Sequence, residues 1–417
     1  MGWAASSPVR RCQKLPQTHC RRLGVTVGGD CEGFSGMGFL ADISGWAAWL
    51  FGYLIPFLFV LTIVVFFHEL GHFLVARWCG IKVLVFSIGF GPELVGFNDR
   101  HGTRWKLAAI PLGGYVKFLG DENAASVPDQ AAVATMSEQD RQQSFFHKPV
   151  SRRAAVVAAG PIANFILAIV IFAAVFMLFG KQMTAARVDS VQADSAAAQA
   201  GFRSGDVITS IEGRPIGGFS DMQRIVSSRA GQPLSFEIER GGVRETLSAT
   251  PALKEIKDNF GNVHRIGVLG ISRSMSPDDV RTERVGPVKA VVMGVEETWF
   301  VVERTLSYLG GVITGRESAD QLGGPIRIAQ VSGQVATLGF TALINLAAVL
   351  SVSIGLLNLF PIPLLDGGHL LFYAIEAARG RPLSERAQEM GFRVGLALVL
   401  MLMIFATFND ILHLASL

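Results

Sequence analysis

Two histidines and a glutamate in the first part of the chain have the types and spacing of a catalytic zinc site. His68 and His72 lie four positions apart in the sequence Phe-Phe-His-Glu-Leu-Gly-His. On a helix, residues four apart share a face, so both imidazoles could bind one zinc ion while Glu69 reaches the attacking water. Catalytic zinc keeps an open position beside three protein ligands. A third ligand must therefore come from elsewhere in the chain.

The motif comes at the end of an apolar run. No charged side chain occurs from Trp46 to Phe67, which is about the length that spans a bilayer. Ionisable groups at membrane depth are costly and usually mark function. This favours a metal site over the alternative, in which two histidines match the pattern by chance and pack in a helix core.

The third zinc ligand is expected at Asp366. This carboxylate follows the apolar segment 335–360, and Pro361 and Pro363 break the helix just before it. A carboxylate at membrane depth on a broken helix is costly unless it is paired with a cation. The alternative is that Asp366 is an ordinary helix cap.

Composition indicates a membrane protein. Half of the 417 residues are hydrophobic and 17% are charged, below the roughly 25% that soluble domains contain. The net charge of +3 comes with no basic stripe interleaved with aromatics, so nucleic acid is not an expected partner. The four cysteines form no Cys-x-x-Cys pair, which makes a thiolate zinc site improbable. We expect a polytopic α-helical protein with about four transmembrane helices, at 46–68, 154–179, 335–360 and 394–414.

The distribution of positive charge predicts the orientation of these helices. Segment 77–153 contains ten Lys or Arg, whereas 37–50 and the tail after Phe408 contain none. The positive-inside rule places segment 77–153 in the cytoplasm. We therefore expect the zinc site near the cytoplasmic side, and both termini and the segment between the second and third spans outside.

The second span contains one polar residue in an apolar run. Its sequence Ala-Ala-Gly-Pro-Ile-Ala-Asn places small residues, including Gly160 and Ala163, where helices could approach closely. Asn164 needs a hydrogen-bond partner there. We expect packing roles for Gly160 and Ala163, and a role of Asn164 beside the metal is the alternative.

Two segments between the spans indicate β structure. Leu107–Phe118 is apolar and contains turn residues but is too short to span, so we expect a strand or a membrane-associated β hairpin beside the metal, or alternatively a soluble hairpin. Residues 186–252 alternate strand and helix patterns, and Ala200–Ile208 resembles the corresponding stretch of PDZ domains. A PDZ-like α/β domain would offer a strand edge to an extended peptide. The alternative is a plug without a ligand.

These observations divide the chain into five parts. Residues 1–36 are expected to be a disordered extension or the product of a wrongly chosen start, and a chain beginning at Met37 is expected to insert and cleave as the full chain does. The amphipathic helix expected over Val288–Leu309 lies at the outer membrane surface or packs against the spans. The other parts are 37–181, the first membrane half; 182–255, the PDZ-like domain; 256–334, a connecting strand and the amphipathic segment; and 335–417, the second membrane half.

The order of the motifs resembles the bacterial site-2 proteases of the regulator of sigma-E protease type. The motifs are His-Glu-x-x-His at 68–72, Gly-Pro-x-x-Asn at 160–164, the PDZ-like domain, and Asn-x-x-Pro-x-Pro-x-Leu-Asp-Gly at 358–367. The chain departs from some relatives in having a single PDZ-like domain, and residues 1–36 have no counterpart.

The resemblance implies a zinc intramembrane protease of the bacterial inner membrane. Such an enzyme cuts single-span membrane proteins, such as anti-sigma factors, after a first protease has removed their outer part. By the same resemblance, Glu69 would be catalytic and Asn358 would help to hold the substrate. The zinc ion would be bound by His68, His72 and Asp366.

Two other functions fit parts of the sequence. A membrane zinc transporter would also place His and Asp in its spans, but it needs a polar path, and the second and fourth spans offer almost none. A catalytically silent receptor that displays the PDZ-like domain would not need Glu69.

Overall fold

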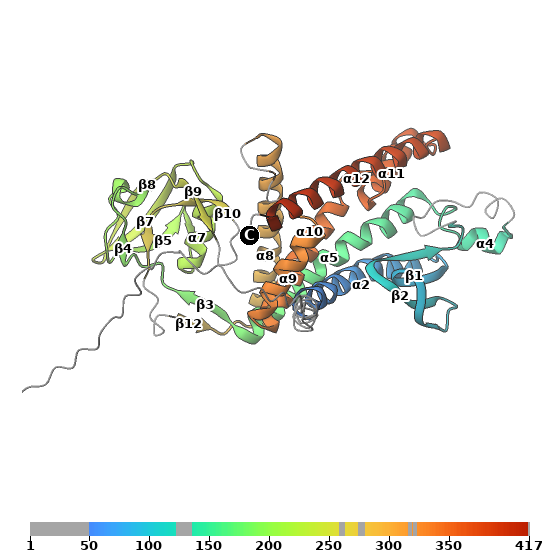
Figure 1. Ribbon diagram of the computed structural model, residues 1–417, viewed down its shortest axis with the longest axis horizontal. Helices are drawn as coiled ribbons and strands as arrows, with labels where there is room; N and C mark the ends of the chain where they lie inside the picture. Colours follow the sequence, from blue (N-terminus) through green and yellow to red (C-terminus); the bar gives the residue numbers. More distant parts are fainter. Residues whose placement is uncertain are drawn as a thin grey trace, which may run out of the picture. The chain divides into compact units, whose positions relative to one another are not determined.

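The structure is a computed structural model that describes residues 50–121, 136–257, 263–273, 280–315, 319 and 323–415 (Figure 1). Within these residues, four helices are long and apolar enough to cross a membrane. The expected polytopic helical architecture is therefore confirmed, and the expected extension 1–36 lies outside the described residues. The four helices cover Phe51–Trp78, Val150–Phe179, Phe340–Asn358 and Arg386–Leu412.

The helix that contains His68 and His72 extends beyond the end of the apolar run. A π-helical turn, η1 (Leu50–Leu54), leads into α2 (Ile55–Trp78), which has a proline in its first turn and continues past the motif. The His-Glu-x-x-His segment thus lies inside a helix rather than at its end. Outside residues 181–286, the other α-helices of the described part of the chain are α4 (Glu138–Gln143), α5 (Val150–Phe179), α8 (Pro287–Ile313), α9 (Pro325–Thr337), α10 (Phe340–Asn358), α11 (Asp366–Arg379) and α12 (Glu385–Ala415).

Helix α5 packs against α2, α8, α10 and α11. Its approach to α2 is close because the contact is made by small residues: a Cβ added at Gly71 would lie 2.3 Å from the carbonyl oxygen of Ala159 and 2.7 Å from Cβ of Ala163. A Cβ at Gly294 of α8 would lie 2.7 Å from the carbonyl oxygen of Ile169. In a lipid bilayer, the hydrophobic effect does not drive helices together, so their association depends on close packing. Small residues at the contact permit this packing because they let the two backbones approach.

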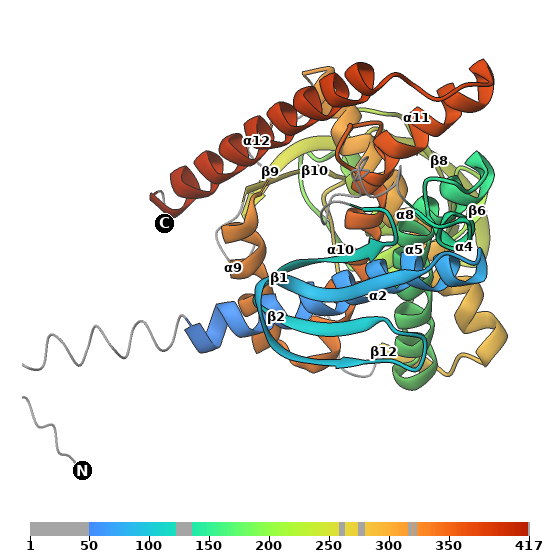
Figure 2. The same cartoon turned by 90° about the vertical axis from the view of Figure 1, so that its right-hand side faces the viewer.

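The segment between α2 and α5 contains two long antiparallel strands, β1 (Val83–Asn98) and β2 (Arg104–Phe118), which lie alongside α2 (Figure 2). Each strand bends, so that residues 85–88 pair with 114–117 on one side and with 104–107 on the other. Gly89 and Gly113 have φ of +89° and +112° near the bends, a conformation that favours glycine. The expected strand at Leu107–Phe118 is therefore present.

An α/β module is inserted between α5 and α8. Its central sheet is antiparallel, with strand order β6-β5-β7-β8, and Leu234, Phe236 and Ile238 alternate into its core as their period-two pattern predicts. The elements of the module are β4 (Ser190–Val191), α6 (Ala196–Ala200), β5 (Val207–Ile211), β6 (Arg214–Pro215), α7 (Phe219–Ser228), β7 (Leu234–Arg240), β8 (Val243–Ala249), β9 (Ala252–Lys257), β10 (Val263–Val268) and β11 (Ile271–Ser272).

The module continues past residue 255, where the sequence placed its end. Strand β10 pairs with β9, and β11 pairs with β4 near the start of the module. Leu269 is buried in the module core. The boundary predicted at residue 255 is therefore too early. Strand pairing between residues about 80 apart cannot be predicted from a local sequence pattern.

Two paired strands connect the module to the helices. β3 (Lys181–Thr184) follows α5 directly and pairs antiparallel with β12 (Val280–Glu283), which precedes α8. Helix α8 confirms the helix expected over Val288–Leu309, and it packs against the second span. Its Glu297 also accepts a hydrogen bond from Nη1 of Arg224 on α7, at 2.7 Å.

The last span is joined to α9 through one carboxylate. Asp410 of α12 is 2% exposed, and its oxygens accept the backbone N–H groups of Gly324 at 2.8 Å and of Ile326 and Arg327 at 3.1 Å. These donors belong to the first turn of α9 and have no partner within the helix. A residue of another helix therefore acts as the cap of α9.

Candidate metal centre and its cavity

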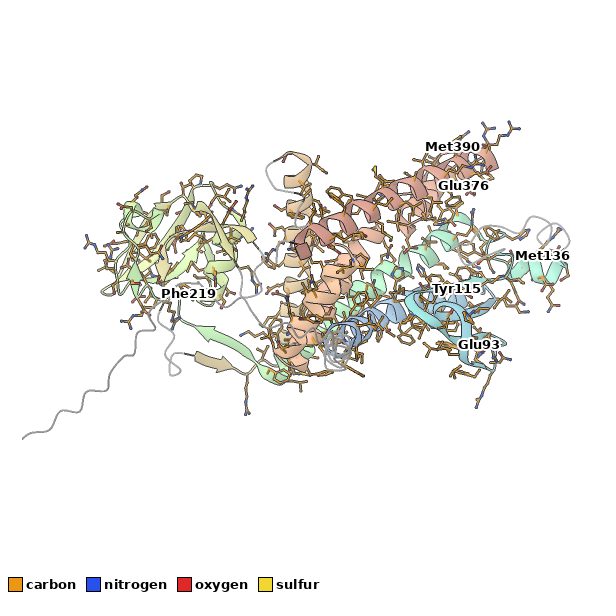
Figure 3. The ribbon with its side chains drawn as sticks, viewed as in Figure 1. Glu93, Tyr115, Met136, Phe219, Glu376 and Met390 are labelled. Atoms are coloured by element: carbon orange, nitrogen blue, oxygen red, sulfur yellow. The ribbon has the colours of Figure 1, made fainter. Side chains whose placement is uncertain are left out.

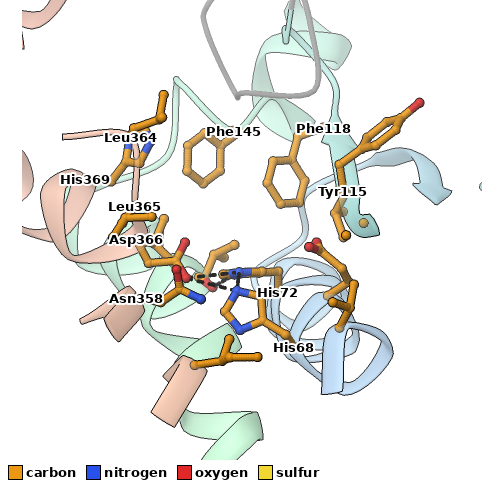
Figure 4. Close-up of a pocket in the computed structure, with 18 of the residues that line it drawn as sticks. His68, His72, Tyr115, Phe118, Phe145, Asn358, Leu364, Leu365, Asp366 and His369 are labelled. Carbon is orange, nitrogen blue, oxygen red and sulfur yellow. Dashed lines mark hydrogen bonds and ion pairs between the residues drawn. The ribbon is translucent and has the colours of Figure 1, made fainter. Parts of the chain in front are cut away.

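All five residues singled out in the sequence line one cavity of about 500 Å³ (Figure 4). His68, Glu69 and His72 come from α2, Asn358 is the last residue of α10, and Asp366 is the first residue of α11. Helices from the two halves of the chain thus supply one site. The roles of the five residues stay predictions.

The three candidate ligands point their free atoms at one another. Nε2 of His68 lies 3.2 Å from Oδ2 of Asp366, Nε2 of His72 lies 3.6 Å from the same oxygen, and the two Nε2 atoms are 3.3 Å apart. Their side chains are 12–18% exposed. Among the described residues, this is the group of His, Cys, Asp or Glu whose atoms could hold a metal ion.

This donor set fits zinc. Ligand atoms that each lie roughly 2.0 Å from a tetrahedral zinc ion are about 3.3 Å apart, close to the three separations above. Oδ2 of Asp366 is buried and accepts no hydrogen bond, which a metal bond would satisfy.

Helix α5 orients both imidazole rings. Nδ1 of His72 donates to the backbone carbonyl oxygen of Val156 at 2.9 Å, which leaves Nε2 without the proton. Nδ1 of His68 lies 3.2 Å from the side-chain amide of Asn164, which is completely buried. The alternative considered for Asn164, a place beside the metal site, is the one that the structure shows.

Gly160 leaves the space that the rings occupy. A Cβ at this position would lie 2.2 Å from Nε2 of His72 and 2.9 Å from Cε1 of His68. The packing role expected for both residues is therefore seen at Ala163, which packs at the contact with α2. Gly160 instead faces the imidazole rings of His68 and His72.

The turn before α11 places Asp366. Leu364 has φ of +111°, which is strained for a residue with a Cβ. Gly367 and Gly368 approach the backbone of the turn so closely that a Cβ would lie 2.2 Å from the carbonyl oxygen of Phe360 and 2.4 Å from that of Ile362, respectively. The prolines break α10 as expected, and the two glycines let the turn fold back onto the start of α11.

A buried ion pair joins α5 to the helix that begins with Asp366. Nη2 of Arg153 lies 2.6 Å from Oε1 of Glu376, and the two side chains are 13% and 14% exposed. The guanidinium carbon of Arg153 also lies 4.9 Å from the ring centre of Tyr373, within range of a cation–π interaction. These contacts fix α11 against the helix that orients both histidines.

One edge of the β sheet faces the cavity. Gly114, Tyr115 and Val116 line it, and Figure 3 marks Tyr115 on β2. A Cβ at Gly114 would lie 2.9 Å from Cγ of Glu69. In the described part of the chain, residues 114–116 pair with 86–88 on one side only, so a further strand could pair with their other edge.

His369 also lines the cavity, and the sequence analysis predicted no role for it. Its ring lies in the cavity wall, with its centre 5.4 Å from that of Phe392 on α12. Burial lowers the pKa of the His369 imidazole below its ordinary value of 6.5, so the ring is neutral near pH 7. A polar side chain three residues after Asp366, one turn along the same helix, was the signal that could have identified it.

Comparison with known proteins gives one consistent result. Residues 56–402 match the profile of Peptidase family M50. A protein of Agrobacterium fabrum named as a zinc metalloprotease is 54% identical over 362 residues, which cover 87% of this chain and 96% of that protein. Metalloprotease MmpA of Caulobacter vibrioides is 44% identical over 380 residues, covering 86% and 95%.

A further relative carries the name expected from the motifs. Regulator of sigma-E protease RseP of Salmonella typhimurium is 33% identical over 454 residues, covering 86% of this chain and 98% of that protein. Among solved structures, the PDZ domain of an SdrC-like protein from Listeria monocytogenes matches with a TM-score of 0.17 and 23% identity, covering 21% of this chain and 83% of that domain. A TM-score this low carries no argument about the fold.

Proposed function

This chain belongs to peptidase family M50 and is a zinc metalloprotease, and we propose that it cleaves single-span membrane proteins within the bilayer, with zinc held by His68, His72 and Asp366. One observation carries the proposal: three ligand atoms lie 3.2–3.6 Å apart beside Glu69 in a cavity between membrane helices. No observation favours a transporter or a silent receptor.

Glu69 is the general base in this proposal. When zinc is bound at the three ligands, it supplies Lewis-acid polarisation of the scissile carbonyl and activation of water. The carboxylate of Glu69 takes a proton from the attacking water and then delivers it to the leaving amine nitrogen. Glu69 suits this role because it adjoins His68 on α2 and lines the cavity without belonging to the ligand cluster.

The substrate enters in an extended form. A peptide bond within a helix hides its carbonyl, so the substrate must unwind before it can react. The open edge at residues 114–116 would accept it as an added strand, and Asn358 would hold it at the opposite wall of the cavity. Exposed apolar residues elsewhere on the sheet support contact with lipid, namely Leu94, Val95, Phe97, Ile110 and Leu112.

We also infer that the α/β module is PDZ-like and lies outside the cytoplasm as a gate. The charge distribution supports a position across the membrane from the zinc site, with both termini on the same side as the module. Its connection through β3 and β12 keeps it near the spans. It would exclude substrates that still carry bulky outer domains, as regulated proteolysis after a first cut requires.

The catalytic proposal is tested on the purified full chain. Zinc content and cleavage of a single-span model substrate are measured for the wild type, for Glu69→Gln and for His68→Ala. Glu69→Gln should abolish cleavage and keep its zinc, whereas His68→Ala should lose both. Substantial cleavage by zinc-loaded Glu69→Gln protein would contradict the assignment of the base.

The gate is tested by deleting the module and comparing trimmed and untrimmed forms of one substrate. A gate predicts that the deleted protein cleaves the untrimmed form. A receptor for a newly exposed carboxyl terminus predicts instead that deletion slows cleavage of the trimmed form. Slower cleavage of both forms would rule out the gate.

A further inference from the structure

We propose that Asn164 is a positioning residue for the zinc site: its side-chain oxygen accepts a hydrogen bond from Nδ1 of His68 and thereby leaves Nε2 of that ring free to bind the metal. The proposal rests on His68 being a zinc ligand, as proposed above.

The argument begins with the protons of the two imidazoles. A neutral imidazole has one N–H donor and one acceptor nitrogen, and only the acceptor can bind a metal. Both Nε2 atoms face Oδ2 of Asp366, the proposed third ligand, so binding of zinc at this point requires the proton of each ring to be on Nδ1. His72 meets this condition, because its Nδ1 faces the carbonyl oxygen of Val156, which can only accept.

His68 has an amide in the corresponding place. Nδ2 of Asn164 lies 3.2 Å from Nδ1 of His68, while the buried Oδ1 of the same amide has no partner. An NH₂ group at Nδ1 would force the proton onto Nε2, among the three ligand atoms. Because the two ends of an amide have nearly the same shape, the hydrogen-bond network decides which end faces the ring. With Oδ1 facing His68, the Nδ1–H of the ring has an acceptor and Nε2 is released, while Nδ2 takes the buried position that Oδ1 leaves.

Asn164 is held firmly enough to serve this purpose. It is 0% exposed, and its backbone carbonyl oxygen accepts a hydrogen bond from Oγ of Ser351 on α10 at 2.8 Å. Gly355, one turn further along α10, leaves room for it: a Cβ there would lie 3.1 Å from Cβ of Asn164. An amide buried in a membrane span is costly without a partner, and the imidazole of His68 is the partner within reach.

The positions on α5 that meet the rings form one stripe. Val156, Gly160 and Asn164 are four residues apart and share a face, as His68 and His72 do on α2. Along this stripe, α5 presents to the rings the carbonyl oxygen of Val156, the space beside Gly160 and the side-chain amide of Asn164. Each imidazole therefore has its own hydrogen-bond acceptor from the same helix, and the gap between them admits both rings.

The test measures zinc affinity of the detergent-solubilised full chain by competition with a chelator, together with the visible absorption of Co²⁺ at the same site. Asn164→Leu has a similar shape and no acceptor, so it should weaken zinc binding by about 10–100-fold and alter the cobalt spectrum. Asn164→Asp supplies only acceptors and should bind zinc within about threefold of wild type, or more tightly.

Ser353→Ala is the matched control, because it removes a serine hydroxyl of the same helix whose hydrogen bond goes to the carbonyl oxygen of Val349 and not to Asn164; it should keep wild-type zinc affinity. Loss of zinc by folded Asn164→Asp protein would overturn the proposal even if Asn164→Leu does not fold. So would wild-type affinity of Asn164→Leu in a protein whose His68→Ala variant loses zinc. Unchanged zinc affinity of His68→Ala would instead refute the ligand assignment, and the proposal with it.

Discussion

Glycines show how differently the zinc-site helices and the α/β module are built. At Gly71 and Gly160, an added Cβ would lie 2.2–2.3 Å from a neighbouring atom, whereas at Gly201 and Gly213 of the module nothing lies within 4 Å. At the zinc site, these glycines provide space for close approach. In the module, Gly201 and Gly213 have positive φ and provide turns, although Gly267 of β10 also permits close approach, since an added Cβ there would lie 2.3 Å from the carbonyl oxygen of Val226. The zinc site therefore tolerates little added volume, and the module depends on its own core and charges.

The α/β module contains a buried carboxylate, Asp206, that forms an ion pair with Arg240. The side chain of Asp206 is 1% exposed, and its carboxylate accepts hydrogen bonds from Nε and Nη2 of Arg240, at 2.7 and 2.8 Å, and from the backbone N–H of Arg203, at 2.8 Å. Burial would raise the pKa of Asp206, but these donors lower it overall. This ion pair joins β7 to the loop before β5, independently of the membrane helices.

The largest effect is expected from Gly160→Ala. The methyl group would displace Nε2 of His72, the proposed metal-binding nitrogen. Zinc affinity should therefore fall by about 100-fold or more, which is at least as much as the loss of a hydrogen-bond partner of a ligand. Zinc affinity is measured by chelator competition.

Gly310→Ala in α8 is the matched control, because this helical glycine has nothing within 4 Å of an added Cβ. It should leave zinc binding unchanged and stabilise the helix by up to about 1 kcal/mol. Equal zinc affinity in the two variants would contradict the idea that Gly160 provides space for the rings.

A smaller effect, confined to the module, is expected from Asp206→Ala. Removing one partner of a buried pair costs about 3 kcal/mol or more, and the 24% exposure of Arg240 places this case at the low end. Hydrogen exchange of the full chain should show faster exchange in β5 and β7. Zinc affinity should not change, and a loss of zinc in this variant would show that the two regions fold as one.

The same carboxylate predicts how the stability of the module depends on pH. Because the pKa of Asp206 is lower in the folded state than its ordinary value of 3.8, its contribution is complete above that value and is lost as the pH falls through the folded pKa. Wild type should therefore be more protected from hydrogen exchange than Asp206→Asn at pH 6, and the difference should shrink below about pH 4. A difference that stays constant with pH would exclude this linkage.

The smallest effect is expected where the two regions touch. Arg224 of α7 pairs with Glu297 of α8, with exposures of 37% and 21%, and its guanidinium carbon lies 4.5 Å from the ring centre of Phe300. Exposed pairs contribute about 0–1 kcal/mol, so Arg224→Ala should speed hydrogen exchange in α7 only slightly. Zinc affinity should change less than twofold. A large change would mean that the module influences the metal site through this contact.

Much of the candidate site was predictable from local spacing. The four-residue interval of His68 and His72 fixes a shared helix face whatever surrounds it, and the prolines before Asp366 mark a helix break at the end of an apolar span. The partner of Asn164 was not predictable. His68 and Asn164 are 96 positions apart, and His72 and Val156 are 84 apart, and a carbonyl oxygen has no sequence signature at all.

The sequence by itself determined the four spans, the two ligand-bearing segments and the strand at 107–118, because apolar length and residue period follow from the chain's own geometry. Only the tertiary structure decided three further features: which end of the sheet faces Glu69, where the module ends, and why Gly160 carries no side chain. Each of these depends on how closely two distant backbones approach. That distance is set by the packing of side chains from both segments, which neither segment encodes alone.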